Sequence, residues 1–160
     1  MMHQPFSEDQ IRRLFAIHFA ATGVMAGVIW VVQLIVYPGF LTIDPNAFAT
    51  YHSDYSNRVT WIVGPAMVFE LITAAALSWI LRATTLRLFL LLNLVSVLAL
   101  WFLTAFLQVP QHATLTEGFD TETIHDLVDG NWFRTAIWTL RVVILSTALP
   151  SVYHIAKPAA

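Results

Sequence analysis

Four long apolar stretches constrain the fold of this chain more than any other feature. Their approximate bounds are 14–37, 59–81, 88–108 and 132–153. A helix of about 20 apolar residues crosses the hydrocarbon core of a bilayer, and each stretch reaches that length. Because backbone groups in lipid must find their hydrogen bonds within the protein, we expect each stretch to be a transmembrane helix.

The composition agrees with a membrane protein and excludes several other classes. Of the 160 residues, 58% are hydrophobic and only 11% are charged, whereas a soluble domain has about 25% charged residues. The stretches use more than half of the chain, so we expect residues 1–160 to form a single transmembrane domain. The net charge of −2 argues against nucleic acid as a partner. The absence of cysteine excludes disulfides, thiolate metal ligands and c-type haem attachment.

Cations gather in only some of the segments that flank the apolar stretches. They are Arg12, Arg13, Arg82, Arg87 and Lys157. The other two connecting segments, 38–58 and 109–131, are mostly acidic. By the positive-inside rule we expect a protein of the cell inner membrane with both termini in the cytoplasm and these two segments outside. The first stretch is too long for the apolar core of a signal peptide, so we interpret it as a retained span.

Helical signals also occur in the two outer segments. Asp44-Pro45 has the pattern of an N-cap followed by proline in the first turn. Asp120 can cap a short helix over 121–129 that ends at Gly130. Together with the short inner connection, these signals predict an all-α membrane protein. We expect an antiparallel four-helix transmembrane bundle with short interfacial helices in both outer loops.

Two opposite charges lie deep inside the apolar stretches. Glu70 is about eleven residues from the outer end of its stretch, and Arg141 is about nine residues into the last one. At about 1.5 Å per residue both lie roughly 15 Å deep. An unpaired charge at that depth costs ~2.5 kcal/mol or more, so we expect Glu70 and Arg141 to pair. The pair either stabilises the bundle or forms the floor of a functional site.

Other polar side chains occupy one face of the first, third and fourth stretches and concentrate toward the outer ends. They are Gln33, Tyr37, Gln108, Asn131, Arg134 and Trp138, with Thr104 among them. Polar groups inside a bilayer face one another or a wet cavity. We therefore expect a polar pocket in the outer half of the bundle, above Glu70 and Arg141. All of these residues except Thr104 are predicted to bind a substrate there. Hydrogen bonding between helices alone is the alternative.

Histidines near the outer ends are candidates for acid–base chemistry or for metal binding. His52 and His112 adjoin the polar faces, and we predict them as catalytic residues together with Glu70 and Arg141. Glu122 and His125 have the i, i+3 spacing found in carboxylate-bridged di-iron proteins, although only one copy is present. Imidazole and carboxylate ligands suit iron, copper or zinc. The alternative is that these histidines bond water or backbone at the interface.

A second cofactor hypothesis concerns the inner end of the bundle. His18 and His154 lie at similar depths there, and two such histidines can ligate a b-type haem. The competing interpretation of His154 is a side chain that reaches the membrane interface.

The last third of the chain carries a resemblance to known proteins. The pattern Gln108-Val109-Pro110-Gln111-His112 is followed by Leu127-Val128 and then by Asn131-Trp132-x-Arg134-Thr135-x-x-Trp138-x-x-Arg141. This pattern resembles small four-helix bacterial membrane proteins of unknown function, which are distantly like the anthrone-oxygenase-like group. The resemblance implies oxidation of a lipophilic aromatic substrate in a membrane-embedded pocket, with or without a metal.

Two classes of function remain open at this point. The first is a membrane oxidoreductase or oxygenase-like enzyme that acts on a lipophilic small molecule in the outer pocket. The second is a non-enzymatic protein: an accessory subunit of a larger membrane complex, or a protein that binds quinone, lipid, pigment or haem. As partners we expect the lipid bilayer, a lipophilic small molecule, and either a larger membrane complex or further copies of the chain in a homo-oligomer. A transporter that moves about Gly64-Pro65 is a third hypothesis.

Overall fold

The computed structural model describes residues 6–155, with side chains to residue 153. Its regular structure is helical throughout. The elements are α1 (Glu8–Val31), η1 (Val32–Val36), α2 (Tyr37–Gly39), η2 (Phe40–Thr42), α3 (Pro45–Ile80), α4 (Arg87–Leu103), η3 (Thr104–Gln108), α5 (Val109–Glu117) and α6 (Thr121–Ile155). Lys157 lies outside the described residues, as does the side chain of His154.

Successive elements join end to end into long helical rods. In the described part of the chain, four rods are long and apolar enough to cross a membrane, with bounds Glu8–Thr42, Pro45–Ile80, Arg87–Glu117 and Thr121–Tyr153. This confirms the prediction of an all-helical protein with four membrane-length helices. Each rod extends well beyond the apolar stretch that predicts it, because the flanking segments are also helical.

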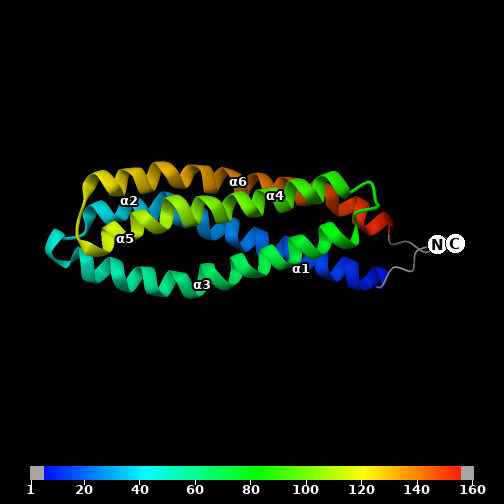
Figure 1. The fold of residues 1–160 in the computed structure, drawn as a ribbon, viewed down its shortest axis with the longest axis horizontal. Coiled ribbons are helices and arrows are strands. Elements are labelled where there is room, and N and C mark those ends of the chain that lie inside the picture. Colours follow the sequence, from blue (N-terminus) through cyan, green and yellow to red (C-terminus); the bar gives the residue numbers. More distant parts are fainter. Residues whose placement is uncertain (1–5, 156–160) are drawn as a thin grey trace.

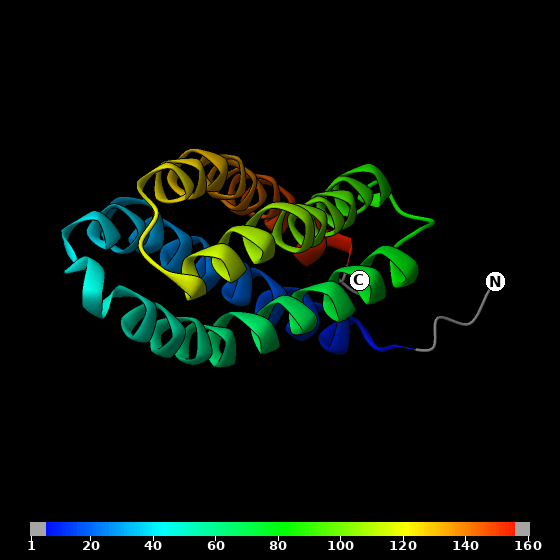
Figure 2. The same cartoon turned by 60° about the vertical axis from the view of Figure 1, so that its left-hand side comes forward.

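The rods lie side by side along their length (Figure 1). α1 packs against α3 and α6, and α4 packs against the same two helices from the other side. α1 begins and α6 ends at one end of the molecule, whereas α2, α5 and the first turns of α3 and α6 lie at the opposite end (Figures 1 and 2). We call this opposite end the distal end.

The segments expected to form separate short helices instead continue the long ones. Asp44 caps α3 by accepting a hydrogen bond of 2.8 Å from the Asn46 backbone, and α3 then runs unbroken to Ile80. Asp120 accepts hydrogen bonds from the Glu122 backbone and from the Thr123 hydroxyl, and the latter lowers the pKa of Asp120. Gly130 lies inside α6 and does not end a helix.

Large apolar side chains cover the outside of the rods as well as the inside. Trp61 is 82% exposed, and Ile35, Phe106 and Phe133 are each about two-thirds exposed. Water would make such a surface unfavourable, whereas lipid chains solvate it. The interior holds two apolar clusters, one near each end of the bundle, and a polar region lies between and beside them.

Candidate functional site

The expected ion pair is present at the centre of the bundle. Arg141 Nη1 lies 2.8 Å from Glu70 Oε1, and both side chains are buried. Thr22 and Trp138 donate hydrogen bonds of 2.8 and 3.1 Å to the two carboxylate oxygens of Glu70, and Arg141 Nε donates to Asn93 Oδ1 at 3.1 Å. These residues come from α1, α3, α4 and α6, so one polar network ties the four rods together.

The same network fixes the proton position on His18. Arg141 can only donate, so the oxygen of Asn93 faces Arg141 and the amide nitrogen of Asn93 lies 3.0 Å from His18 Nε2. Nε2 of His18 therefore accepts, and Nδ1 donates to Thr73 Oγ1 at 2.7 Å. Both ring nitrogens are thus engaged by protein side chains, which disfavours His18 as an axial haem ligand.

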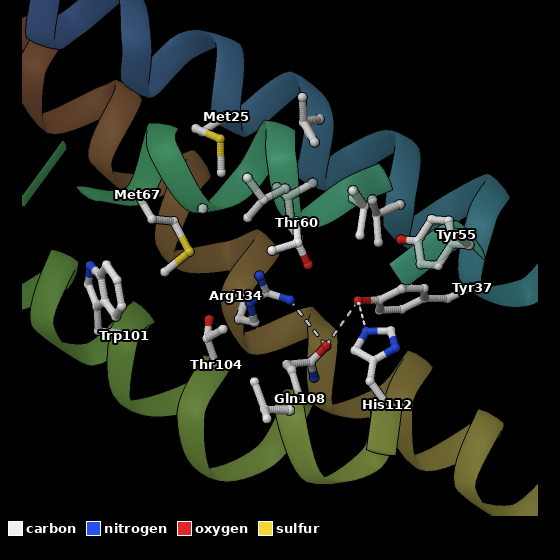
Figure 3. Close-up of a pocket in the computed structure, with 17 residues that line it drawn as sticks. Met25, Tyr37, Tyr55, Thr60, Met67, Trp101, Thr104, Gln108, His112 and Arg134 are labelled. Carbon is white, nitrogen blue, oxygen red and sulfur yellow. Dashed lines mark hydrogen bonds between the residues drawn. The ribbon is translucent and has the colours of Figure 1, made fainter. Parts of the chain in front are cut away.

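A cavity of about 230 Å³ lies between the rods (Figure 3). It is on the distal side of the network, since the lining residues Met25 and Met67 are offset from Thr22 and Glu70 by three residues toward that end. Its walls are mostly apolar, and four polar residues gather at one side: Tyr37, Gln108, His112 and Arg134. The lining residues do not include Glu70 or Arg141. The network therefore does not form the floor of the cavity, because Met25 and Met67, one helical turn away from it, close that end instead.

Arg134 is the charged residue of the cavity wall. Its Nη1 donates to Gln108 Oε1 at 3.1 Å and to Asn131 Oδ1 at 3.0 Å. Gln33 Oε1 in turn accepts from Asn131 at 2.8 Å, and Trp138 lies under the guanidinium with its ring centroid at 5.5 Å. Of the six predicted substrate-binding residues, Tyr37, Gln108 and Arg134 line the cavity, whereas Gln33, Asn131 and Trp138 hold Arg134 in place.

Several buried polar atoms in the cavity wall have no hydrogen-bond partner within the described part of the chain. They are Arg134 Nε, Trp101 Nε1 and Thr104 Oγ1. A buried polar group without a partner costs about 1–3 kcal/mol, and proteins rarely retain such groups without a reason. These three atoms have almost no accessible surface, so they lie behind the cavity wall and do not face the open cavity.

Backbone irregularities occur in three rods at the level of the cavity. The π-helical turn η1 contains Gln33, and the π-helical turn η3 contains Thr104 and Gln108. In α3, Gly64 lines the cavity and Pro65 follows it inside the helix. Proline removes a backbone hydrogen bond, and π-helical turns are frequent at functional sites. The rods are thus deformed where the cavity lies.

His52 and His112 form a direct pair beside the cavity. His52 Nε2 lies 2.9 Å from His112 Nδ1, and the two rings are stacked with their centroids 5.1 Å apart. Glu122 and His125 are exposed on α6. Among the described residues, no three histidine, aspartate or glutamate side chains gather closely enough to hold a metal ion. The structure therefore does not bring the four predicted metal ligands together.

Sequence reasoning missed the apolar and aromatic part of the site. Met25 and Met67 carry no sequence signal that separates them from ordinary core residues. Trp101 does carry one, because it lies on the same helical face as Thr104 and Gln108.

Comparison with known proteins assigns no family, because no family model, no curated protein and no solved structure matches the chain.

Proposed function

We propose that this is an integral membrane protein whose cavity binds a lipophilic aromatic molecule with a carbonyl or phenolic oxygen. The observation that carries the proposal is the Arg134 guanidinium in a mostly apolar cavity wall, beside the polar side chains of Tyr37, Gln108 and His112. A guanidinium is a donor only, so a ligand that complements Arg134 must present an acceptor. The remaining walls are apolar, which favours an aromatic body around that acceptor.

The size of the cavity and its position limit the ligand further. An engineered protein cavity of about 150 Å³ holds benzene, so about 230 Å³ accommodates a two-ring compound. Thr60 and Val109 both line the cavity and are exposed on the outside of the rods, Val109 by 57%. In a membrane this rim faces hydrocarbon, so the ligand enters sideways from the bilayer between α3 and α5.

Binding is testable by fluorescence, because Trp101 lies in the wall. In protein reconstituted into lipid nanodiscs, we expect 2-methyl-1,4-naphthoquinone to quench tryptophan emission with a saturable component. Trp101→Phe should reduce that component to the part that comes from Trp138, which lies behind Arg134. Trp79→Phe is the matched control, because Trp79 lies in the last turn of α3 and is exposed. Saturable quenching of equal size in the Trp101→Phe protein would contradict the proposed site.

A second candidate function is an oxygenase-like oxidation of the bound molecule. It is favoured by the Tyr37 hydroxyl, which lies 3.0 Å from His112 Nε2 at the cavity wall and close to Arg134. With an anthrone, whose third ring would extend into the rim between Thr60 and Val109, this acid–base pair would take a proton from the methylene carbon while Arg134 stabilises the enolate oxygen. Molecular oxygen is the oxidant: the methylene becomes a second ketone, the O–O bond breaks, and one water is released.

Oxygen uptake tests this second candidate. Native protein in nanodiscs should consume one O₂ for each anthraquinone formed from added anthrone, and His112→Phe should lower the rate about 100-fold, the usual contribution of a positioned acid or base. His125→Phe, at an exposed histidine of α6, is the control. A rate that is the same in both variants would leave ligand binding as the function.

We also propose that the rods form an antiparallel bundle in the cell inner membrane, with both termini in the cytoplasm. The chain has no cysteine, so single cysteines can be introduced into the native background. Thr114→Cys, at the distal end, should react with a membrane-impermeant maleimide applied to intact cells. Ser7→Cys should react only after permeabilisation. The opposite labelling pattern would invert the proposed orientation.

A further inference from the structure

A row of polar side chains connects the cavity with the surface of the distal end. The Tyr37 hydroxyl, which lines the cavity, lies 3.0 Å from His112 Nε2 (Figure 3). His112 Nδ1 lies 2.9 Å from His52 Nε2, and His52 Nδ1 lies 3.4 Å from Thr116 Oγ1. Thr116 is exposed. Each of the two histidines uses one ring nitrogen toward the cavity and the other toward the surface.

The row allows two complementary arrangements of its protons. A neutral imidazole has one N–H donor and one acceptor nitrogen. In the first arrangement Tyr37 donates to His112 Nε2, His112 Nδ1 donates to His52 Nε2, and His52 Nδ1 donates to Thr116. In the second arrangement every bond of the row is reversed, and Tyr37 donates instead to Gln108 Oε1, which lies 3.2 Å from its hydroxyl. The same heavy-atom positions serve both.

We propose that Tyr37, His112, His52 and Thr116 form a relay that exchanges protons between the cavity ligand and water at the distal surface. The proposal rests on the proposed function, because the ligand supplies or receives the proton. When a ligand hydroxyl releases a proton to Tyr37 oxygen, the Tyr37 proton passes to His112 Nε2.

The remaining steps conserve the protons. The Nδ1 proton of His112 passes to His52 Nε2, and the Nδ1 proton of His52 passes to Thr116 oxygen, whose own proton leaves to water. One proton has then left the ligand and one has entered water, and both imidazoles have changed tautomer. Uptake of a proton from water runs the same steps in reverse.

Neighbouring side chains fix the positions of the groups that form the relay. Phe48 stacks on His52 with an interplanar angle of 17°, and Phe40 packs edge-on against the same ring. In the first arrangement the Thr116 hydroxyl donates to the His112 backbone oxygen at 2.8 Å, and in the second it rotates to donate to His52 Nδ1. These contacts keep the imidazoles in a fixed geometry, which a proton relay requires.

A phenolic ligand whose light absorption depends on its ionisation makes the relay measurable. The probe is 7-hydroxycoumarin, a two-ring lactone with a carbonyl acceptor and an ionisable phenol. His52 does not line the cavity, so His52→Phe should leave probe affinity unchanged. After a rapid pH jump, ionisation of the bound probe should be about 100-fold slower in this variant than in the native protein. His125→Phe is the matched control and should keep the native rate.

Chemical rescue separates a relay from a merely structural role. His52→Ala should recover fast ionisation when imidazole is added to the buffer, because the free base replaces the missing ring. A native rate in His52→Phe with probe binding retained overturns the relay and leaves the ligand site standing. Failure of the native protein to bind the probe overturns the ligand site and the relay together.

A measurement without ligand or substitution provides a second, independent test. With ¹⁵N-labelled histidine, a nitrogen–nitrogen coupling across the hydrogen bond between His112 and His52 should be observable in the native protein. Absence of that coupling would overturn the relay even if His52→Phe failed to fold.

Discussion

Replacing Arg141 with methionine should destabilise the protein by about 3–5 kcal/mol, the usual cost of leaving one partner of a buried ion pair uncompensated. Glu70 would keep its hydrogen bonds from Thr22 and Trp138 but lose the cation that lies 2.8 Å away. Asn93 would lose a donor as well. Unfolding in mixed micelles with increasing SDS measures the difference.

The double variant distinguishes the effect of an uncompensated charge on stability from the effect of changing the side-chain volume. Glu70→Met combined with Arg141→Met removes both charges, and we expect it to be more stable than Arg141→Met alone because no uncompensated charge remains in the bundle. Arg58→Met is the control, since Arg58 is exposed and solvent screens its pair with Asp54. An Arg141→Met protein as stable as the control would show that Glu70 needs no counter-charge.

Replacing Arg134 with methionine should weaken binding of the naphthoquinone by roughly 10- to 100-fold. A hydrogen bond from a charged donor contributes about 1.5–3 kcal/mol, and every 1.4 kcal/mol is about a tenfold change in affinity. The saturable quenching of Trp101 measures this directly. Arg134→Lys should bind with intermediate affinity, because lysine keeps the charge but lacks the planar fork of the guanidinium.

Stability and binding must be measured together for this residue. Arg134 also donates to Gln108 and Asn131, so its removal leaves two acceptors without that donor. Unfolding of Arg134→Met in SDS will show how much of any binding loss comes from a looser bundle. Unchanged affinity in a stable Arg134→Met protein would exclude Arg134 as the ligand contact.

The parts of the structure that could be predicted are those for which a bilayer leaves few solutions. The four helical rods follow from apolar length, because lipid allows few other backbone conformations. The pairing of Glu70 with Arg141 follows from equal depth and from the cost of either charge alone. Both inferences depend only on the depth of a residue along its helix axis. That depth follows from the residue number and the rise per residue.

The arrangement of the cavity wall could not be predicted in the same way. Each π-helical turn accommodates an extra residue and rotates everything after it by about 100° relative to a regular helix. η1 rotates the helix directly before Tyr37, and η3 rotates the helix one turn before His112. Faces assigned by a uniform period are therefore unreliable beyond these turns. Continuation of α6 across Gly130 also leaves Glu122 and His125 exposed.

The central polar network has a consequence for biosynthesis, because its members are far apart in the chain. Arg141 is translated 141 − 70 = 71 residues after Glu70. At a translation rate of about 5–20 residues per second, Arg141 is synthesised roughly 4–14 s after Glu70. A product that stops before the last rod never receives that cation. In a truncated protein Glu70 therefore lacks its counter-charge, and burial of its carboxylate costs more than in the finished molecule.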